Sequence, residues 1–176
     1  IINNTLNNTN SNNTTNNIIN NNNIIVKINP FGQENTDFLK KNDILKIINR
    51  CYMAIPELIQ QIHNRPENRN FYIPNFNKKI MAHLNKNNEI EYNEYDNICE
   101  KIIQKNISRL DTYFSEYEKN IKRSIKNRMM KVLEGNHKGD LDDKYIDNIK
   151  FYLMNISKKN KTELNDFIDN MEIKLN

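Results

Sequence analysis

The sequence has few of the residues that usually mark a chemical site. Its 176 residues include 2 Cys, 3 Gly, 3 His and no Trp. Cys51 and Cys99 are too few for a disulfide framework, and their separation lacks the paired spacing of a zinc finger. The three glycines lie far apart or in predicted turns, so no glycine-rich phosphate loop is present. These absences exclude the disulfide-rich, zinc-finger and P-loop classes.

Signals for membranes and secretion are absent as well. No apolar run approaches the roughly 18 residues that span a bilayer, and residues 1–6 do not form the apolar part of a secretory signal. We therefore expect no membrane partner, and a reducing compartment. The formal charge of +4 permits an acidic partner without requiring one. Because the first residue is not Met, we expect the chain to be part of a longer protein.

Asparagine, isoleucine and lysine are abundant, with 37, 27 and 20 copies. These residues have A/T-rich codons, so part of the composition reflects the genome. Residues 1–23 alone hold 13 Asn, 4 Thr and 4 Ile, and carry no charge. One interpretation of the Asn-rich tract, residues 1–28, is a disordered linker that cannot bury enough apolar surface to fold. The other is an oligomerising stalk of extended strands stacked through Asn ladders.

A second region, residues 29–92, is predicted to contain two helices and a small antiparallel sheet. It opens with the turn Asn29-Pro30-Phe31-Gly32, in which Pro and Gly supply the required backbone angles. Apolar spacing predicts helices over residues 42–50, with Asn42 or Asp43 as a cap, and over residues 54–63. Three short runs, at residues 71–73, 79–84 and 89–92, predict strands, although the second also fits a helical turn.

The third region, residues 93–176, is predicted to be helical. An apolar seam from Cys99 to Val132 permits one helix of about 40 residues, used as a coiled coil, or two pieces broken near Lys119 and Asn120. Gly135 and Asn136 are predicted to end that helix. Residues 145–156 and 160–175 then read as two helices of a hairpin, the second opening with a capping box. The predicted fold is mainly α with a small antiparallel β-sheet.

No catalytic or metal site is predicted. The three possible bases, His63, His83 and His137, share no motif with either cysteine. An acidic group resembles a calcium loop but lacks its glycine and closing glutamate, so we interpret it as helix capping; it comprises Asp140, Asp142, Asp143 and Asp147. We therefore predict a protein that is not an enzyme and that needs no cofactor.

One charge pattern predicts a binding surface. Six cations and no acid occur between residues 119 and 131, while Ile121, Ile125 and Met129 face the other way. The candidate contacts to nucleic acid or another anionic surface are Lys119, Lys122, Arg123, Lys126, Arg128 and Lys131. A basic helix face of this kind can follow phosphates. In a lysine-rich chain it is also typical of an ordinary solvated face, so both interpretations stay open.

Several short blocks resemble a known family. They are the Asn-Pro-Phe-Gly-Gln-Glu turn at residues 29–34, Ala-Ile-Pro-Glu-Leu-Ile at residues 54–59, Ile62-His63 and Tyr72-Ile73-Pro74. In this order, after an Asn-rich tract, they resemble an uncharacterised protein family of giant DNA viruses, similar to those of mimivirus. A tryptophan expected after the second strand is absent, and the resemblance implies no catalytic residues. It implies a viral protein, located in the virus factory of the host cytoplasm or in the virion.

The predicted function is a non-enzymatic viral module that assembles as a homo-oligomer and binds nucleic acid or another viral protein. A first alternative is a structural or scaffold protein of the virion or virus factory that does not bind nucleic acid. A second is an exported helical interaction protein of an A/T-rich parasite, which shares the composition but lacks the Asn-Pro-Phe-Gly block.

Overall fold

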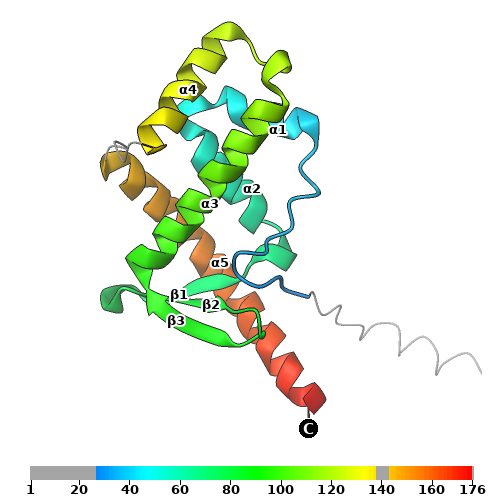
Figure 1. Ribbon diagram of the computed structural model, residues 1–176. Coiled ribbons are helices and arrows are strands. Elements are labelled where there is room, and N and C mark those ends of the chain that lie inside the picture. Colours follow the sequence, from blue (N-terminus) through cyan, green and yellow to red (C-terminus); the bar gives the residue numbers. More distant parts are fainter. Residues whose placement is uncertain (1–26, 138–142, 176) are drawn as a thin grey trace, which may run out of the picture.

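The computed structural model describes residues 27–137 and 143–175. Five α-helices and one sheet of three strands make up this part of the chain (Figure 1). The predicted fold class is therefore confirmed for the described residues. The Asn-rich residues 1–26 lie outside them, so neither interpretation of that tract is tested. No helix within the described ranges is long and apolar enough to cross a membrane.

The described chain begins with an extended segment that contains the predicted turn. Gln33 donates its backbone N–H to the carbonyl of Pro30 at 2.9 Å, and Gly32 has φ +83°. That angle lies in the left-handed region, which glycine reaches without steric cost. The turn is anchored to the sheet, because Phe31 N–H donates to the carbonyl of Leu84 at 2.8 Å.

The first two helices form where the apolar spacing predicts them. Helix α1 spans Lys41–Asn49 and helix α2 spans Ala54–His63. Their buried isoleucines and leucines lie on the sides that face each other and the rest of the core. Asn42 and Asp43 lie inside the first turn of α1 and do not cap it, because the helix begins at Lys41 and its N-cap, Lys40, makes no side-chain bond. Pro56 falls in the first turn of α2, where its missing N–H costs nothing.

The predicted strands form an antiparallel sheet in the order β1-β2-β3. Strand β1 spans Phe71–Asn75, β2 spans Ile80–Leu84 and β3 spans Ile90–Glu94. The second run is therefore a strand and not a helical turn. Register pairs Phe71 with His83 and Ala82 with Tyr92. The hairpin between β2 and β3 is closed by Asn85, whose side-chain oxygen accepts from the N–H groups of Asn87 and Glu89.

The long apolar seam is divided between two helices. Helix α3 spans Tyr95–Glu116, a single 3₁₀ turn covers Glu118–Asn120, and helix α4 spans Arg123–His137. Of the two predicted alternatives, one long helix or two pieces broken near Lys119 and Asn120, the structure shows the second. Ile121 adopts an extended conformation between the helices, and its side chain is buried. The chain turns back there, so α4 packs against α1 and the turn after it (Figure 1). Helix α4 continues past Gly135, because glycine permits a helix end but does not enforce one.

The predicted C-terminal hairpin is wrong, because residues 143–175 form one helix, α5 (Asp143–Leu175). Ser157, in the stretch that reads as a link, and Asn160, the predicted start of the second helix, are both buried inside it. Ser157 accepts a hydrogen bond from the backbone N–H of Ile73 at 2.7 Å, and Asn160 donates to the carbonyl of Phe71 at 3.0 Å. Asn160 therefore satisfies the edge of strand β1 and is not the start of a capping box.

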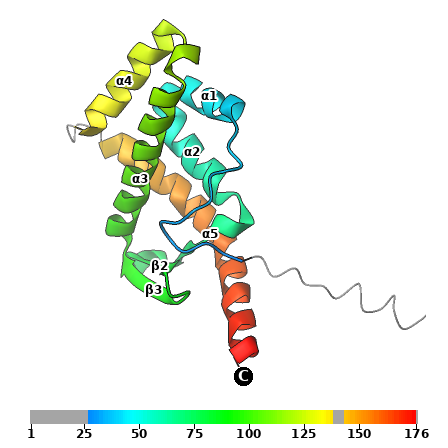
Figure 2. The same cartoon turned by 45° about the vertical axis from the view of Figure 1, so that its right-hand side comes forward.

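Helix α5 connects two apolar clusters on opposite faces of the sheet. Phe71, Ile73 and Met81 belong to the main cluster, which joins the five helices and includes Leu153 of α5. Alternate strand residues face the other way and form a second cluster with α5; its members are Ile28, Tyr72, Ala82, Leu84, Leu164 and Phe167. The helix passes the edge of β1 between these clusters, which is where its sequence is polar. Figure 2 shows α5 running past the sheet.

Candidate functional site

The six predicted contact residues lie at the junction of α3 and α4, which we call the basic corner. Lys119 is in the 3₁₀ turn, Lys122 precedes α4, and Arg123, Lys126, Arg128 and Lys131 lie in α4 itself. All are exposed except Lys126, which is half-buried. Ile121 and Met129 are buried and Ile125 packs against the core, so the apolar residues do face away from the cations.

The charges of the basic corner are largely uncompensated. Lys126 forms an ion pair with Glu118, with 3.0 Å between Nζ and Oε1. Within residues 27–137 and 143–175, none of the other five cations of the corner has an ion pair. Such a surface attracts polyanions, and the positive end of the α4 dipole lies in the same place.

The shape of the corner is broader than a single stripe. At about 100° per residue, the four cations of α4 cover about 200° of the helix circumference. Lys119 and Lys122 add charge beside the first turn of the helix. A seventh cation, Lys41 of α1, lies 5.8 Å from the centre of the Tyr117 ring. Sequence reasoning missed Lys41, since only the packing of α1 against the end of α3 brings it near the corner.

A second polar cluster, which the sequence analysis did not predict, surrounds Glu34. Its buried carboxylate accepts from the backbone N–H of Gly32 at 2.7 Å and from the side-chain amide of Asn70 at 3.2 Å. It also forms ion pairs with Arg109 at 2.8 Å and with Lys105 at 3.3 Å, both on α3. The cluster fastens the turn at residues 29–34 to helix α3.

The charge state of Glu34 follows from these partners. Burial by itself raises the pKa of this carboxyl, but the hydrogen bond from Arg109 and the positive charges of Arg109 and Lys105 outweigh burial and lower the pKa to about 2. Glu34 is therefore ionised at neutral pH, and its charge is already compensated within the protein.

Asn68 and His63 extend the same cluster toward α2. The Asn68 side-chain oxygen accepts from the Asn29 side chain and from the backbone N–H of Asn35, while its amide donates to the carbonyls of Asn35 and Ile62. The Nδ1 atom of His63 lies 2.8 Å from the carbonyl of Asn68. Burial lowers the pKa of His63, so the ring is neutral at pH 7 and donates from Nδ1. Two of the blocks that carry the family resemblance, residues 29–34 and Ile62-His63, thus meet in one hydrogen-bonded network.

The remaining polar candidates form no reactive arrangement in the part of the chain that the structure describes. Cys51 and Cys99 are buried, and burial raises the pKa of the Cys99 thiol to about 11. His83 lies 3.1 Å from the Asn93 amide and stacks on Phe31. No group of three His, Cys, Asp or Glu residues is arranged to hold a metal ion among the described residues.

The structure describes only two of the four acidic residues that were interpreted as helix capping. Asp140 and Asp142 lie outside the described residues, Asp143 is the first residue of α5, and Asp147 is exposed on that helix. His137 is the last residue of α4.

Comparison with known proteins gives no relative: the chain matches no protein-family model, and neither the curated proteins nor the solved structures include a significant match. The resemblance to the giant-virus family therefore stays a prediction.

Proposed function

We propose that this chain is a non-enzymatic module that binds nucleic acid at the basic corner and assembles with further copies of itself. The observation that supports DNA binding most directly is the set of five exposed corner cations with no ion pair in the described part of the chain. Phosphate contacts of this kind supply most of the affinity of non-specific binding.

The composition of the corner favours recognition of the backbone over recognition of bases. Four of its six cations are lysines, which bind phosphate as flexible point charges, whereas bidentate reading of guanine is mainly a property of arginine. The cations also cover a wide arc of α4 and not one edge. We therefore expect binding with little sequence preference.

Charge reversal at the corner tests this proposal. The variant carries Lys122→Glu, Arg123→Glu and Lys126→Glu, and its binding to a fluorescent duplex is measured by anisotropy. A matched control reverses three exposed lysines far from the corner, Lys78, Lys158 and Lys161, and has the same net charge. We expect the corner variant to lose binding and the control to keep most of it. Equal binding by the two variants would show that the corner is only a solvated face.

Self-assembly is supported by two exposed aromatic side chains. Phe151, in the first third of α5, is 62% exposed, and Phe76, in the turn between β1 and β2, is 44% exposed. This observation also favours the alternative function, a scaffold protein of the virion or virus factory without nucleic-acid binding. Such a scaffold would assemble normally and would not bind the duplex at physiological salt.

Light scattering tests the assembly. The full chain is compared with a truncated form that lacks residues 1–26 and keeps Ile28, because Ile28 is buried between the sheet and α5. We expect a multimeric mass for the full chain and a lower mass after truncation if the Asn-rich tract is a stalk. A monomeric mass for both forms would contradict self-assembly. On the resemblance to giant-virus proteins, we place the module in the virus factory of the host cytoplasm or in the virion.

A further inference from the structure

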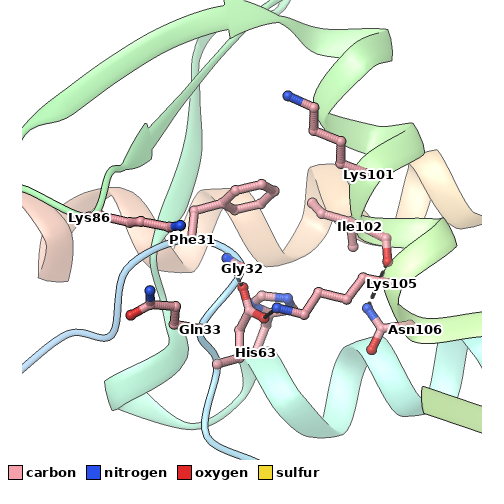
Figure 3. Close-up of a pocket in the computed structure, with 10 residues that line it drawn as sticks. Phe31, Gly32, Gln33, His63, Lys86, Lys101, Ile102, Lys105 and Asn106 are labelled. Atoms are coloured by element: carbon pink, nitrogen blue, oxygen red, sulfur yellow. Dashed lines mark hydrogen bonds and ion pairs between the residues drawn. The ribbon is translucent and has the colours of Figure 1, made fainter. Parts of the chain in front are cut away.

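A pocket of about 490 Å³ lies between the turn at residues 29–34, the tip of the β2–β3 hairpin and helix α3 (Figure 3). Its volume is within the range of sites for small molecules. The aromatic ring of Phe31 forms one wall and Ile102 of α3 contributes an apolar side chain. The basic corner is at the other end of α3, so this pocket is separate from the proposed DNA-binding surface.

Three lysines, which we call the pocket lysines, line this cavity. Lys86 comes from the hairpin tip, and Lys101 and Lys105 lie one turn apart on α3. Figure 3 shows Lys86 on one side of Phe31 and the two α3 lysines on the other, with the Lys105 side chain running toward the turn and Lys101 at the rim. Across the residues that the structure describes, neither Lys86 nor Lys101 has an ion pair.

The acid in the pocket does not balance these charges. Glu34 is the one carboxylate among the residues that line it, and Arg109, which lies outside the lining, bonds this carboxylate at 2.8 Å. Lys105 pairs with the same carboxylate at 3.3 Å, so Glu34 is shared between two cations. The pocket therefore keeps a surplus of positive charge, which Lys86, Lys101 and the shared Lys105 carry. A phosphate monoester carries about two negative charges at neutral pH, which suits this surplus better than a single carboxylate does.

The wall of the pocket offers a surface for a ring. The Phe31 ring packs against the ring of His83 in strand β2, with 4.8 Å between ring centres and a tilt of 37°, so the sheet behind it sets its position. The Glu34 cluster fixes the backbone of Gly32 beside it. A rigid aromatic wall next to an excess of positive charge is prepared for a ligand that has both a flat ring and a phosphate, because little ordering is required on binding.

We propose that this pocket binds a small organic phosphate that carries a ring. The phosphate lies among the amines of the pocket lysines, and the ring lies against Phe31. This site is independent of the proposed DNA binding, since it uses none of the six cations of the basic corner.

Calorimetry on the full chain tests the proposal with three probes: adenosine monophosphate, ribose phosphate and adenosine. We expect saturable, salt-sensitive binding of adenosine monophosphate, weaker binding of ribose phosphate, and no binding of adenosine. Lys101→Gln and Lys86→Gln should each weaken binding of adenosine monophosphate about tenfold, the effect of one lost charged hydrogen bond. Both lysines are exposed, so neither change threatens folding.

Two controls separate this site from general attraction of anions. Lys78→Gln and Lys161→Gln remove the same charge from exposed positions outside the pocket and the basic corner, and should leave the affinity unchanged. The proposal is overturned if neither phosphate probe saturates, if adenosine binds as tightly as adenosine monophosphate, or if Lys101→Gln binds like the unmodified chain. If the corner variant loses DNA binding but still binds adenosine monophosphate, the two sites are independent.

Discussion

Asn160, in the middle of helix α5, donates its side-chain amide to the backbone carbonyl of Phe71, with 3.0 Å between the two atoms. Three residues earlier in α5, Ser157 accepts from the next outward-facing backbone group of the same strand, the N–H of Ile73. An open strand edge presents unpaired donors and acceptors, and unpaired groups are costly when buried. The two side chains of α5 therefore take the place of a fourth strand beside β1.

Asn160→Ala should destabilise the protein, because it leaves the buried carbonyl of Phe71 without a donor. We expect the free energy of unfolding to fall by about 1–3 kcal/mol. Asn155→Ala is the matched control, since Asn155 is an exposed residue of the same helix and both changes gain similar helix propensity. Urea unfolding followed by circular dichroism measures both. Equal midpoints for the two variants would contradict this role of Asn160.

Glu34→Gln should lower the free energy of unfolding at neutral pH. It should also make that free energy less dependent on pH in the acid range. The folded pKa of Glu34 is about 2, below its ordinary 4.5, so the folded state holds the carboxyl proton less tightly than the unfolded state does. Its contribution is therefore complete above pH 4.5 and is lost as the pH falls toward 2. Because each pKa unit corresponds to about 1.4 kcal/mol, the full contribution is on the order of 3 kcal/mol.

The measurement is the difference in free energy of unfolding between the unmodified chain and Glu34→Gln from pH 7 down to the acid limit of folding. We expect this difference to be constant above pH 4.5 and to shrink below it. Glu100→Gln, which removes a carboxylate from an exposed position of α3, is the matched control. A difference that does not change with pH would show that the carboxylate charge of Glu34 is not what stabilises the turn.

His63 should stay neutral in the folded protein below pH 6.5, with its proton on Nδ1. Burial lowers its pKa, so the unfolded state binds a proton more readily, and the stability that neutral His63 contributes is present above pH 6.5 and lost as the pH falls. Nitrogen-15 spectra of the imidazole report both the tautomer and the titration. A neutral ring that carries its proton on Nε2 would contradict the hydrogen bond to Asn68, and a ring that is charged at pH 6.5 would contradict the lowered pKa.

Local sequence patterns predict the parts of the fold that depend on neighbouring residues. The apolar stripes of α1 and α2 and the three short strands appear where the sequence predicts them, because apolar spacing and β-prone runs are local signals. The run at residues 79–84 also fits a helical turn, and its pairing with β1 and β3 makes it a strand. The C-terminal hairpin was predicted wrongly for a physical reason. Ser157 and Asn160 look like a solvent-exposed link, and only their contact with β1, 84 and 89 residues away, explains polar residues inside a helix.

The same distinction between local and long-range signals applies to the candidate sites. The basic corner is visible in the sequence, because its six cations are close neighbours in the chain. The Glu34 cluster is not, since Arg109 is 75 residues away and Asn70 is 36 residues away from the carboxylate they bind. The pocket lysines likewise come from a hairpin tip and a helix, and no local spacing relates Lys86 to Lys101.

The salt dependence of DNA binding tests the central claim, that the basic corner binds phosphates, most directly. The measurement is the slope of log affinity against log salt for the unmodified chain and for a variant with Lys122→Gln, Arg123→Gln and Lys126→Gln. With up to six phosphate contacts we expect a slope of about −5, and loss of three contacts should reduce its magnitude by about 3. Identical slopes for the two proteins, or no binding at physiological salt by either, would contradict the account.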